Sequence, residues 1–204
     1  MTKCFTWHNL SKSIESNSFM VEDRFKREGV FKMQNREAAY YIEHLNMEQH
    51  PEGGHFARSF YSHEKMNTSG NKIRNLYTTI YFCLKSEEVS HLHRLQSDEL
   101  WFFHDGSSLT VHVILSNGEY KAHQLGLNFE KGETPQVLVP KGAIFGSSVD
   151  QDESFSLVGC MVSPGFDFED FELFTQEELL TLYPQHKELI EKMAFQKIVG
   201  QTHL

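Results

Sequence analysis

Histidines and carboxylates gather between Ser90 and Gly106. This stretch reads SHLHRLQSDELWFFHDG, so His91 and His93 are followed by a carboxylate at Glu99. Side chains two residues apart in a strand point to the same face, which places His91 and His93 together. Imidazole and carboxylate groups that converge in this way are what a divalent metal site or a general acid/base pair requires.

Three functions are compatible with these residues. In the first, His93 and Glu99 transfer protons on a small molecule, and a tyrosine such as Tyr81 serves as the acid. In the second, His91, His93 and Glu99 bind a divalent metal ion, and solvent fills the open coordination positions. In the third, the pocket binds or senses a metabolite without any reaction. The residues alone leave these alternatives open, and with them the question whether the protein is an enzyme.

Further residues are candidates for ligand binding. Glu52 lies beside two glycines in the segment HPEGG, whose backbone freedom suits a loop that presents Glu52 and backbone N–H groups to an anion. Arg58 and Arg94 carry guanidinium groups whose geometry matches a carboxylate or a phosphate. Trp101, which shares a strand face with Glu99, suits the apolar wall of a pocket.

Short β-type segments must position these residues. Nine of them follow His50 and Pro51, at residues 54–62, 75–84, 89–95, 98–104, 109–115, 119–125, 136–140, 143–148 and 154–162. Turn residues such as Asp105-Gly106 and Asn117-Gly118 separate the segments. Nine strands without an intervening helix predict a mainly β fold, either a sandwich, a jelly roll or a barrel.

Helices are predicted only at the two flanks of these strands. Asn35 can cap an N-terminal helix with one apolar stripe, formed by Ala38, Tyr41, Ile42 and Leu45. Thr175 and Glu178 have the spacing of a capping box, and Pro184 suits the first turn of a second C-terminal helix. We therefore expect a domain at residues 35–197, with an N-terminal extension or arm at 1–34 and a tail at 198–204.

Composition narrows the range of partners. The chain has 204 residues, and 19 Lys and Arg against 28 Asp and Glu give a net charge of −9, which disfavours nucleic acid. No stretch is apolar enough to span a membrane, and the N-terminus lacks the apolar core of a signal peptide, so we expect a cytoplasmic protein without a membrane partner. Motifs of nucleotide-binding loops and serine hydrolases are absent from the sequence.

The histidine stretch, together with Pro140-Lys-Gly142-Ala-Ile-Phe145, resembles the two conserved blocks of the cupin superfamily. This resemblance implies a double-stranded β-helix, the cupin jelly-roll barrel. It departs from the family pattern at two places: five residues separate His93 from Glu99, and Phe145 stands where a further metal-binding histidine is usual. The divalent metal site that the superfamily implies, with ligands His91, His93 and Glu99, is therefore incomplete.

A closer resemblance spans roughly residues 37–185. The motifs HPEGGHF, HR with SDELW, QVLVP, and VSPGFDF with DFE are similar to those of the uncharacterised DUF985 (Cupin 5) subfamily, which has an RmlC-like jelly roll. This implies a homodimer with a ligand-sized pocket, to which Gln136 and Phe145 are assigned as ligand-binding residues. The position of His91 varies in that subfamily, which favours His93 and Glu99. Metal-independent sugar epimerases of the cupin type imply proton transfer by such a pair, so we expect a small-molecule-binding cupin with isomerase-like or epimerase-like chemistry.

Overall fold

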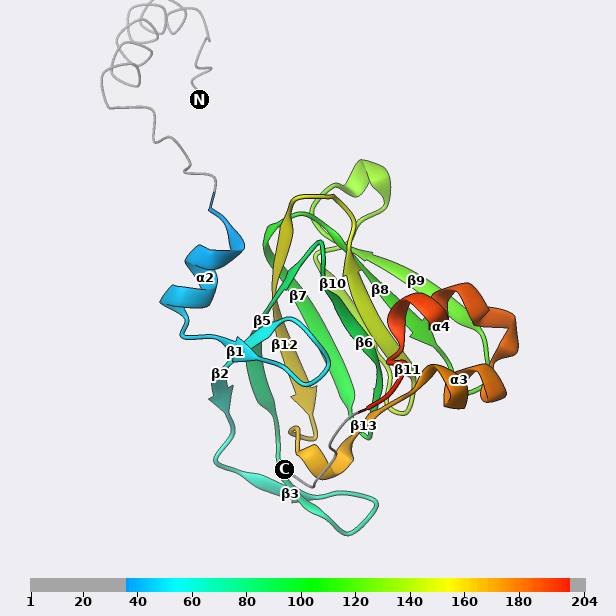
Figure 1. Cartoon of the computed structure of the whole chain (residues 1–204). Coiled ribbons are helices and arrows are strands. Elements are labelled where there is room, and N and C mark those ends of the chain that lie inside the picture. The colour runs from blue at the N-terminus through cyan, green and yellow to red at the C-terminus, as the bar shows by residue number, and fades with distance from the viewer. Residues whose placement is uncertain (1–35, 199–204) are drawn as a thin grey trace, which may run out of the picture. The chain divides into compact units, whose positions relative to one another are not determined.

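The computed structural model describes residues 36–198 of the chain. The expected arm at residues 1–34, the expected helix cap Asn35 and residues 199–204 lie outside the described residues. All the described residues belong to one compact unit (Figure 1).

Two antiparallel sheets face each other and enclose the core. One has the strand order β1-β2-β5-β12-β7-β10 and the other β13-β6-β11-β8-β9. The six-stranded sheet consists of β1 (Glu48–Gln49), β2 (His55–Tyr61), β5 (Thr78–Lys85), β12 (Phe155–Ser163), β7 (Asp98–Gly106) and β10 (Gln136–Val139). The five-stranded sheet consists of β13 (Phe171–Leu173), β6 (Val89–Leu95), β11 (Ile144–Val149), β8 (Leu109–Ile114) and β9 (Tyr120–Leu125). This is the predicted jelly-roll barrel.

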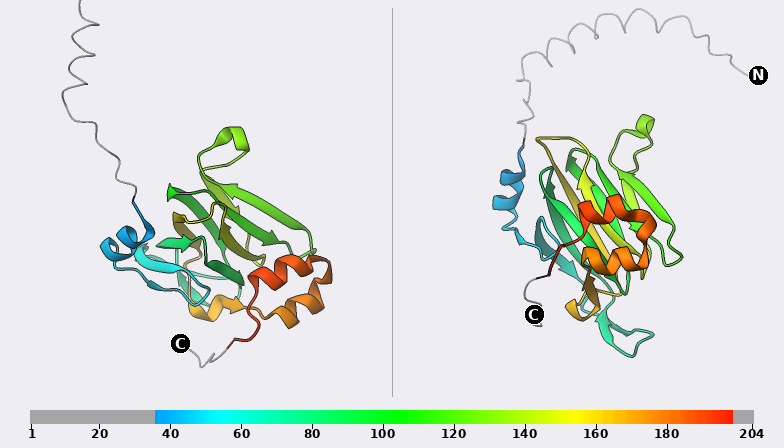
Figure 2. Two further views of the ribbon diagram at one scale, coloured as in Figure 1. Left: turned by 45° about the horizontal axis from the view of Figure 1, so that its top comes forward. Right: turned by 45° about the vertical axis from the view of Figure 1, so that its right-hand side comes forward.

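All nine predicted strands are present, and four short ones were not predicted. β3 (Lys65–Asn67) and β4 (Ile73–Asn75) form a separate hairpin, and it projects from one end of the barrel (Figures 1 and 2). β1 extends one sheet edge, and β13 pairs with β6 at the edge of the other sheet. These strands have two or three residues each, too few to show a period of two in the sequence.

Helices cover the outer faces of both sheets. α2 (Ala38–His44) packs on the six-stranded sheet, where Ala38 and Tyr41 join Cys83 and Leu157 in a cluster of buried side chains. α3 (Gln176–Leu182) and α4 (Lys187–Met193) lie outside the five-stranded sheet (Figure 2). Short 3₁₀ turns occur at Phe129–Lys131, Phe168–Asp170 and Pro184–His186.

The observed helix ends agree with the predictions at α3 and α4 but not at α2. Thr175 and Glu178 form the capping box in full, and Pro184 opens the turn before α4. The predicted cap of α2 is wrong, because the helix begins at Ala38 with Glu37 in the capping position and without a side-chain hydrogen bond. Packing of the apolar stripe, rather than a cap, therefore stabilises this short helix.

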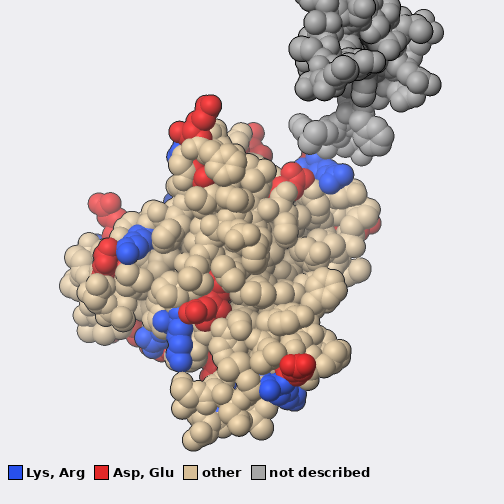
Figure 3. Space-filling view, turned by 180° about the vertical axis from the view of Figure 1, so that it is seen from behind, with Lys and Arg blue, Asp and Glu red and all other residues tan. Residues whose placement is uncertain are grey.

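The surface has few charges on one side. Figure 3 shows a face on which acidic and basic side chains are scattered and most of the area belongs to other residues. None of the helices between residues 36 and 198 is long and apolar enough to cross a membrane.

Candidate functional site

A cavity of about 630 Å³ is lined by residues of both sheets and by Asn75 of β4. Five of the predicted site residues line it, namely Glu52, Arg58, His93, Glu99 and Trp101. Aromatic side chains form much of the remaining wall, including Phe56, Phe60, Tyr61, Phe82, Phe166 and Phe168. The cavity therefore combines a few polar groups with an apolar lining, as ligand pockets do.

Strand β7 places Glu99 and Trp101 in the cavity, as the two-residue period predicted. Both side chains are buried, and β7 is paired on both sides, with β12 through Glu99 and Val162 and with β10 through Glu99 and Val139. A central strand with two neighbours has little freedom to shift. The carboxyl group of Glu99 is therefore held in a fixed position on the inner wall.

The segment HPEGG positions Glu52. Gly53 and Gly54 have φ angles of 107° and 69°, a backbone conformation that glycine adopts without steric cost. A tight turn results, in which the Gly53 N–H donates to the His50 carbonyl over 2.9 Å and the His50 N–H donates to the Gly54 carbonyl over 3.0 Å. The His91 N–H donates to the Glu52 carbonyl over 2.7 Å and so ties the turn to β6. The glycines thus allow the turn that presents Glu52, as the sequence predicted.

Three polar groups surround the buried carboxylate of Glu52. Its Oε2 atom lies 3.2 Å from Nε2 of His93 and 3.3 Å from Nδ1 of His50, and Ser90 donates its hydroxyl to Oε1 over 2.8 Å. Burial alone would raise the pKa of Glu52, but the two imidazoles and the hydroxyl outweigh it and lower this pKa to about 2. Glu52 is therefore an anion at neutral pH.

Opposing effects act on the protonation of His93 next to this anion. Its Nδ1 lies 2.7 Å from the His91 carbonyl oxygen, and its Nε2 faces Glu52. Both contacts are attractive only when both ring nitrogens carry hydrogen, which is the imidazolium form. Burial lowers the pKa of His93, while the charge of Glu52 and the bond to the His91 carbonyl oppose this effect. Accepting a proton thus creates an ion pair, and releasing it relieves a buried charge.

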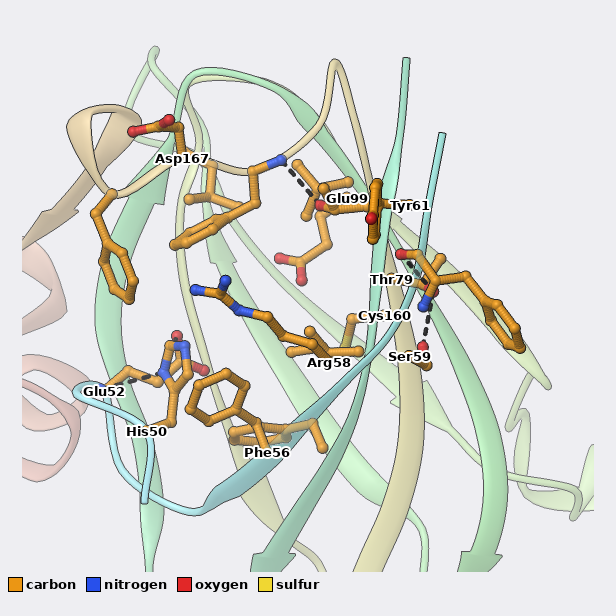
Figure 4. Close-up of a pocket in the computed structure, with 18 of the residues that line it drawn as sticks. His50, Glu52, Phe56, Arg58, Ser59, Tyr61, Thr79, Glu99, Cys160 and Asp167 are labelled. Carbon is orange, nitrogen blue, oxygen red and sulfur yellow. Dashed lines mark hydrogen bonds and ion pairs between the residues drawn. The ribbon is translucent and has the colours of Figure 1, made fainter. Parts of the chain in front are cut away.

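Glu99 has the opposite protonation state. Burial, followed by the negative charge of Glu52, raises the pKa of Glu99 to about 8. It is therefore a neutral carboxylic acid at neutral pH and can donate a hydrogen bond or a proton. Figure 4 shows Glu52 and Glu99 on different walls, with the Arg58 side chain extending into the space between them.

A β-bulge shapes the wall that carries Arg58. The pairing of β2 with β5 shifts between Arg58 and Tyr61, so one additional residue is inserted into β2. Thr79 fixes the bulge through a hydrogen bond of 2.7 Å to the Ser59 hydroxyl and one of 3.0 Å from the Phe60 N–H. As a result, both Arg58 and Tyr61 line the cavity.

A second bulge removes His91 from the cavity. The pairing of β11 with β6 shifts between Phe145 and Ser147, so that β6 contains an additional residue between Ser90 and His93. The expectation that His91 and His93 share a face is wrong for this reason, because a bulge interrupts the two-residue alternation. The ring of His91 instead stacks on Phe195, with 3.7 Å between ring centroids and 6° between ring planes.

Four other candidate residues do not line the cavity. The alternation along β5 turns Ile80 and Phe82 inward, so Tyr81 faces the cluster under α2. In β6 the same alternation directs Arg94 outward, where Glu172 accepts its Nε–H over 3.0 Å. Gln136 is exposed on β10, whose inward residues are Val137 and Val139. Phe145 is buried behind His93, 4.0 Å away between ring centroids, and supports the imidazole from the core.

The expected metal ligands do not fit a metal ion. With His91 outside the cavity, only His93 and Glu99 of the three line it, and Phe145 supplies no ligand atom. Across residues 36–198 no group of three or more His, Cys, Asp or Glu side chains is arranged to hold a metal. A catalytic metal needs about three protein ligands, so the cavity lacks this requirement.

Sequence reasoning missed several residues of the cavity. His50 and Ser90 begin the two motifs that were recognised, but neither was a candidate. His50 lines the cavity, Ser90 lies behind it, and both contact Glu52. Their proximity depends on the HPEGG turn and on the bulge in β6, and bulges leave no periodic signal in a single sequence. Phe166, Asp167 and Phe168 reach the cavity from the segment after β12, in which no candidate residue was named.

Comparisons with known proteins agree with this architecture. Residues 39–174 match the family described as Cupin superfamily (DUF985). The uncharacterized protein YML079W of Saccharomyces cerevisiae is 30% identical over 146 residues, which cover 65% of this chain and 72% of that protein. A hypothetical protein from Leishmania major has 44% identity and a TM-score of 0.77, over 79% of this chain and 100% of its own. Protein SO0799 from Shewanella oneidensis has 52% identity and a TM-score of 0.74, over 79% and 99% of the two chains.

Proposed function

We propose that this chain, which belongs to the DUF985 family of the cupin superfamily, binds a small molecule inside its barrel and transfers protons on it. Such chemistry is that of a metal-independent isomerase or epimerase. One observation carries the proposal: the Glu52–His93 pair and the carboxyl group of Glu99 line the same cavity.

The protonation states support an acid and a base in one site. The surroundings of Glu52 keep it ionised, with a pKa of about 2, whereas those of Glu99 keep it neutral, with a pKa of about 8. Two titratable groups with pKa values shifted apart in this way are the usual sign of an acid and base assignment. The cavity of about 630 Å³ is also within the range of small-molecule sites.

The proposed reaction acts on a carbon next to a carbonyl group. The reaction begins with neutral His93, whose Nδ1–H donates to the His91 carbonyl and whose Nε2 carries the free lone pair. His93 accepts the proton of that carbon at Nε2 and becomes an imidazolium ion, which Glu52 stabilises. Glu99 gives its proton to the carbonyl oxygen, so that a neutral enol forms without a free negative charge. In an isomerisation, the His93 imidazolium gives its proton to the neighbouring carbon of an enediol, and the hydroxyl group that becomes the new carbonyl returns a proton to Glu99. In an epimerisation, the enol oxygen returns its proton to Glu99, and the same carbon receives a proton on its opposite face after the enol has turned in the cavity.

Hydrogen exchange with solvent tests this proposal on many candidate substrates at once. Small carbonyl compounds, including aldoses, ketoses and keto acids, are incubated with the protein in D₂O, and NMR measures deuterium incorporation next to the carbonyl. We expect Glu99→Gln and His93→Asn to reduce the exchange rate by about 10² or more. His104→Asn and Glu87→Gln, which change exposed residues outside the cavity, serve as matched controls.

Other results would favour the alternatives. A compound that binds in the cavity but exchanges no hydrogen would indicate a binding or sensing module. Exchange that requires an added divalent metal, and that is lost with His91→Ala, would indicate a metal-dependent cupin. Unchanged exchange in both cavity variants would contradict the assigned acid and base.

A further inference from the structure

Arg58 differs from the other arginines of the described structure. Arg74 donates to Asp170 and Glu169, Arg94 donates to Glu172, and Arg36 donates to the Tyr41 hydroxyl. Arg58 has no hydrogen bond or ion pair with any residue between 36 and 198, although its side chain extends into the cavity (Figure 4). Arg58 is exposed to solvent, and its guanidinium group with five donors extends into the open cavity.

The acidic groups of the cavity do not compensate this charge. Glu52 is engaged by His93, His50 and Ser90, and Glu99 is a neutral acid at neutral pH. Asp167 lies 3.9 Å from the guanidinium of Arg74 and accepts the Glu169 N–H over 3.0 Å.

A second donor in the cavity also lacks a partner. Trp101 is only 1% exposed, and its Nε1–H has no hydrogen bond within the described part of the chain. The carboxyl group of Glu99 is near enough to the Trp101 N–H for this donor to lower the pKa of Glu99, but the two groups do not reach full hydrogen-bond geometry. Buried polar groups are almost always hydrogen-bonded, and an exception inside a cavity marks a place that a ligand atom satisfies.

We propose that the substrate carries an oxyanion, a carboxylate or a phosphate ester, which Arg58 binds in the cavity while an oxygen of the substrate accepts the Trp101 N–H. This inference rests on the proposed function and names its substrate class. The bulge in β2 holds the backbone beside Arg58, which limits the entropy lost when the guanidinium binds an anion. Carboxylates and phosphates match the guanidinium fork in two parallel hydrogen bonds.

NMR titration of the arginine side chains tests the anion site. Inorganic phosphate, malonate and the uncharged analogue malonamide are added separately to the full-length protein, and the ¹H–¹⁵Nε signals of Arg58 and Arg94 are followed. We expect a saturable shift at Arg58 with at least one of the two anions, and none with malonamide. If malonate binds more tightly than phosphate, the substrate carries a carboxylate; if phosphate binds more tightly, it carries a phosphate ester. No saturation with either anion, or equal shifts at Arg58 and Arg94, would overturn the proposal.

Variants separate this inference from the proposed chemistry. Arg58→Gln is expected to weaken binding of the preferred anion at least tenfold, Arg58→Lys to retain part of it, and Arg94→Gln, outside the cavity, to change nothing. Equal binding by Arg58→Gln would overturn the anion site. Hydrogen exchange could also depend on Glu99 yet occur only in uncharged compounds. That result would overturn the anion site and leave the proposed function in place. Anion binding at Arg58 without any hydrogen exchange would overturn the proposed function alone.

Discussion

Glu52 Oε2 lies 3.2 Å from His93 Nε2, and this contact joins a loop residue to a strand residue inside the barrel. The HPEGG turn provides one partner and β6 the other. Neither group is in its ordinary electrostatic environment, because burial disfavours both charges and each charge stabilises the other.

Removing the charge of Glu52 is expected to lower the pKa of His93 further. In Glu52→Gln the imidazolium loses the carboxylate that opposes the effect of burial, and the expected decrease is about one pH unit or more. The ¹³Cε1 shift of His93, followed from pH 4 to pH 9, measures it. Glu172→Gln, an exposed carboxylate variant outside the cavity, is the control, and an unchanged or higher His93 pKa in Glu52→Gln would contradict the pairing.

The neutral carboxyl group of Glu99 should make the free energy of unfolding depend on pH. Its pKa rises from 4.5 to about 8 on folding, so its stabilising effect is complete below pH 4.5 and is lost as the pH rises through 8. Glu99→Gln stays neutral, and its free energy of unfolding relative to the wild type should therefore increase between pH 5 and pH 9. We expect an increase on the order of a few kcal/mol, measured by urea unfolding at each pH.

The same measurement on Glu87→Gln provides the reference. Glu87 is exposed, and its replacement should change stability equally at both pH values. A Glu99→Gln curve parallel to that of the wild type would mean that Glu99 is ionised in the folded protein.

Residues with a regular period were predictable, and residues placed by irregular backbone were not. Glu99 and Trp101 occupy alternate positions of a strand paired on both sides, so the period of two predicted their common face. His91 occupies an equally regular position in the sequence, but the additional residue in β6 reverses its direction. A bulge depends on the pairing partner, which a strand's own sequence does not specify.

The cavity residues can also be separated into those that the sequence predicted and those that it did not. Glycines beside Glu52 predicted a tight turn, and that turn is present. The contact of Glu52 with His50 and His93 was not predictable, because it depends on where the turn meets β6. Tyr81 shows the reverse case: its residue type suited acid chemistry, but its strand position directs it to the outer face of the sheet.

Gly53 is expected to be essential for the position of Glu52. A β-carbon at this residue would collide with the Val89 carbonyl oxygen, and the φ angle of 107° adds strain for any other residue. Gly53→Ala should lower the free energy of unfolding by at least about 2 kcal/mol and abolish ligand binding. Gly132→Ala is the matched control, since Gly132 has a φ of 80° but no atom within 4 Å of the added carbon. Equal losses in the two variants would show that only backbone strain matters.

Association into a homodimer stays a prediction. Around β2 and the β3–β4 hairpin lie several exposed apolar side chains, namely Phe60, Tyr61, Met66, Ile73 and Tyr77. Several large apolar side chains exposed on neighbouring elements are candidates for a contact with another protein chain. Light scattering should give twice the chain mass of 23.7 kDa, and Ile73→Asp should shift the protein toward the monomer. A monomeric wild type at micromolar concentration would contradict this prediction.

His91 and His93 provide the sharpest comparison between structural and chemical roles. His91→Ala removes a ring that stacks on Phe195 and contacts the Glu52 carbonyl oxygen through Nδ1 over 2.9 Å, and it should lower the free energy of unfolding by about 1 kcal/mol. The backbone hydrogen bond from the His91 N–H to that carbonyl remains, so hydrogen exchange should stay at the wild-type rate. His93→Ala removes the proton acceptor and should abolish the exchange. Urea unfolding and deuterium incorporation on the same two variants separate these effects. If loss of His91 stopped exchange as completely as loss of His93, the imidazole of His91 would have to reach the substrate, which the bulge in β6 does not allow.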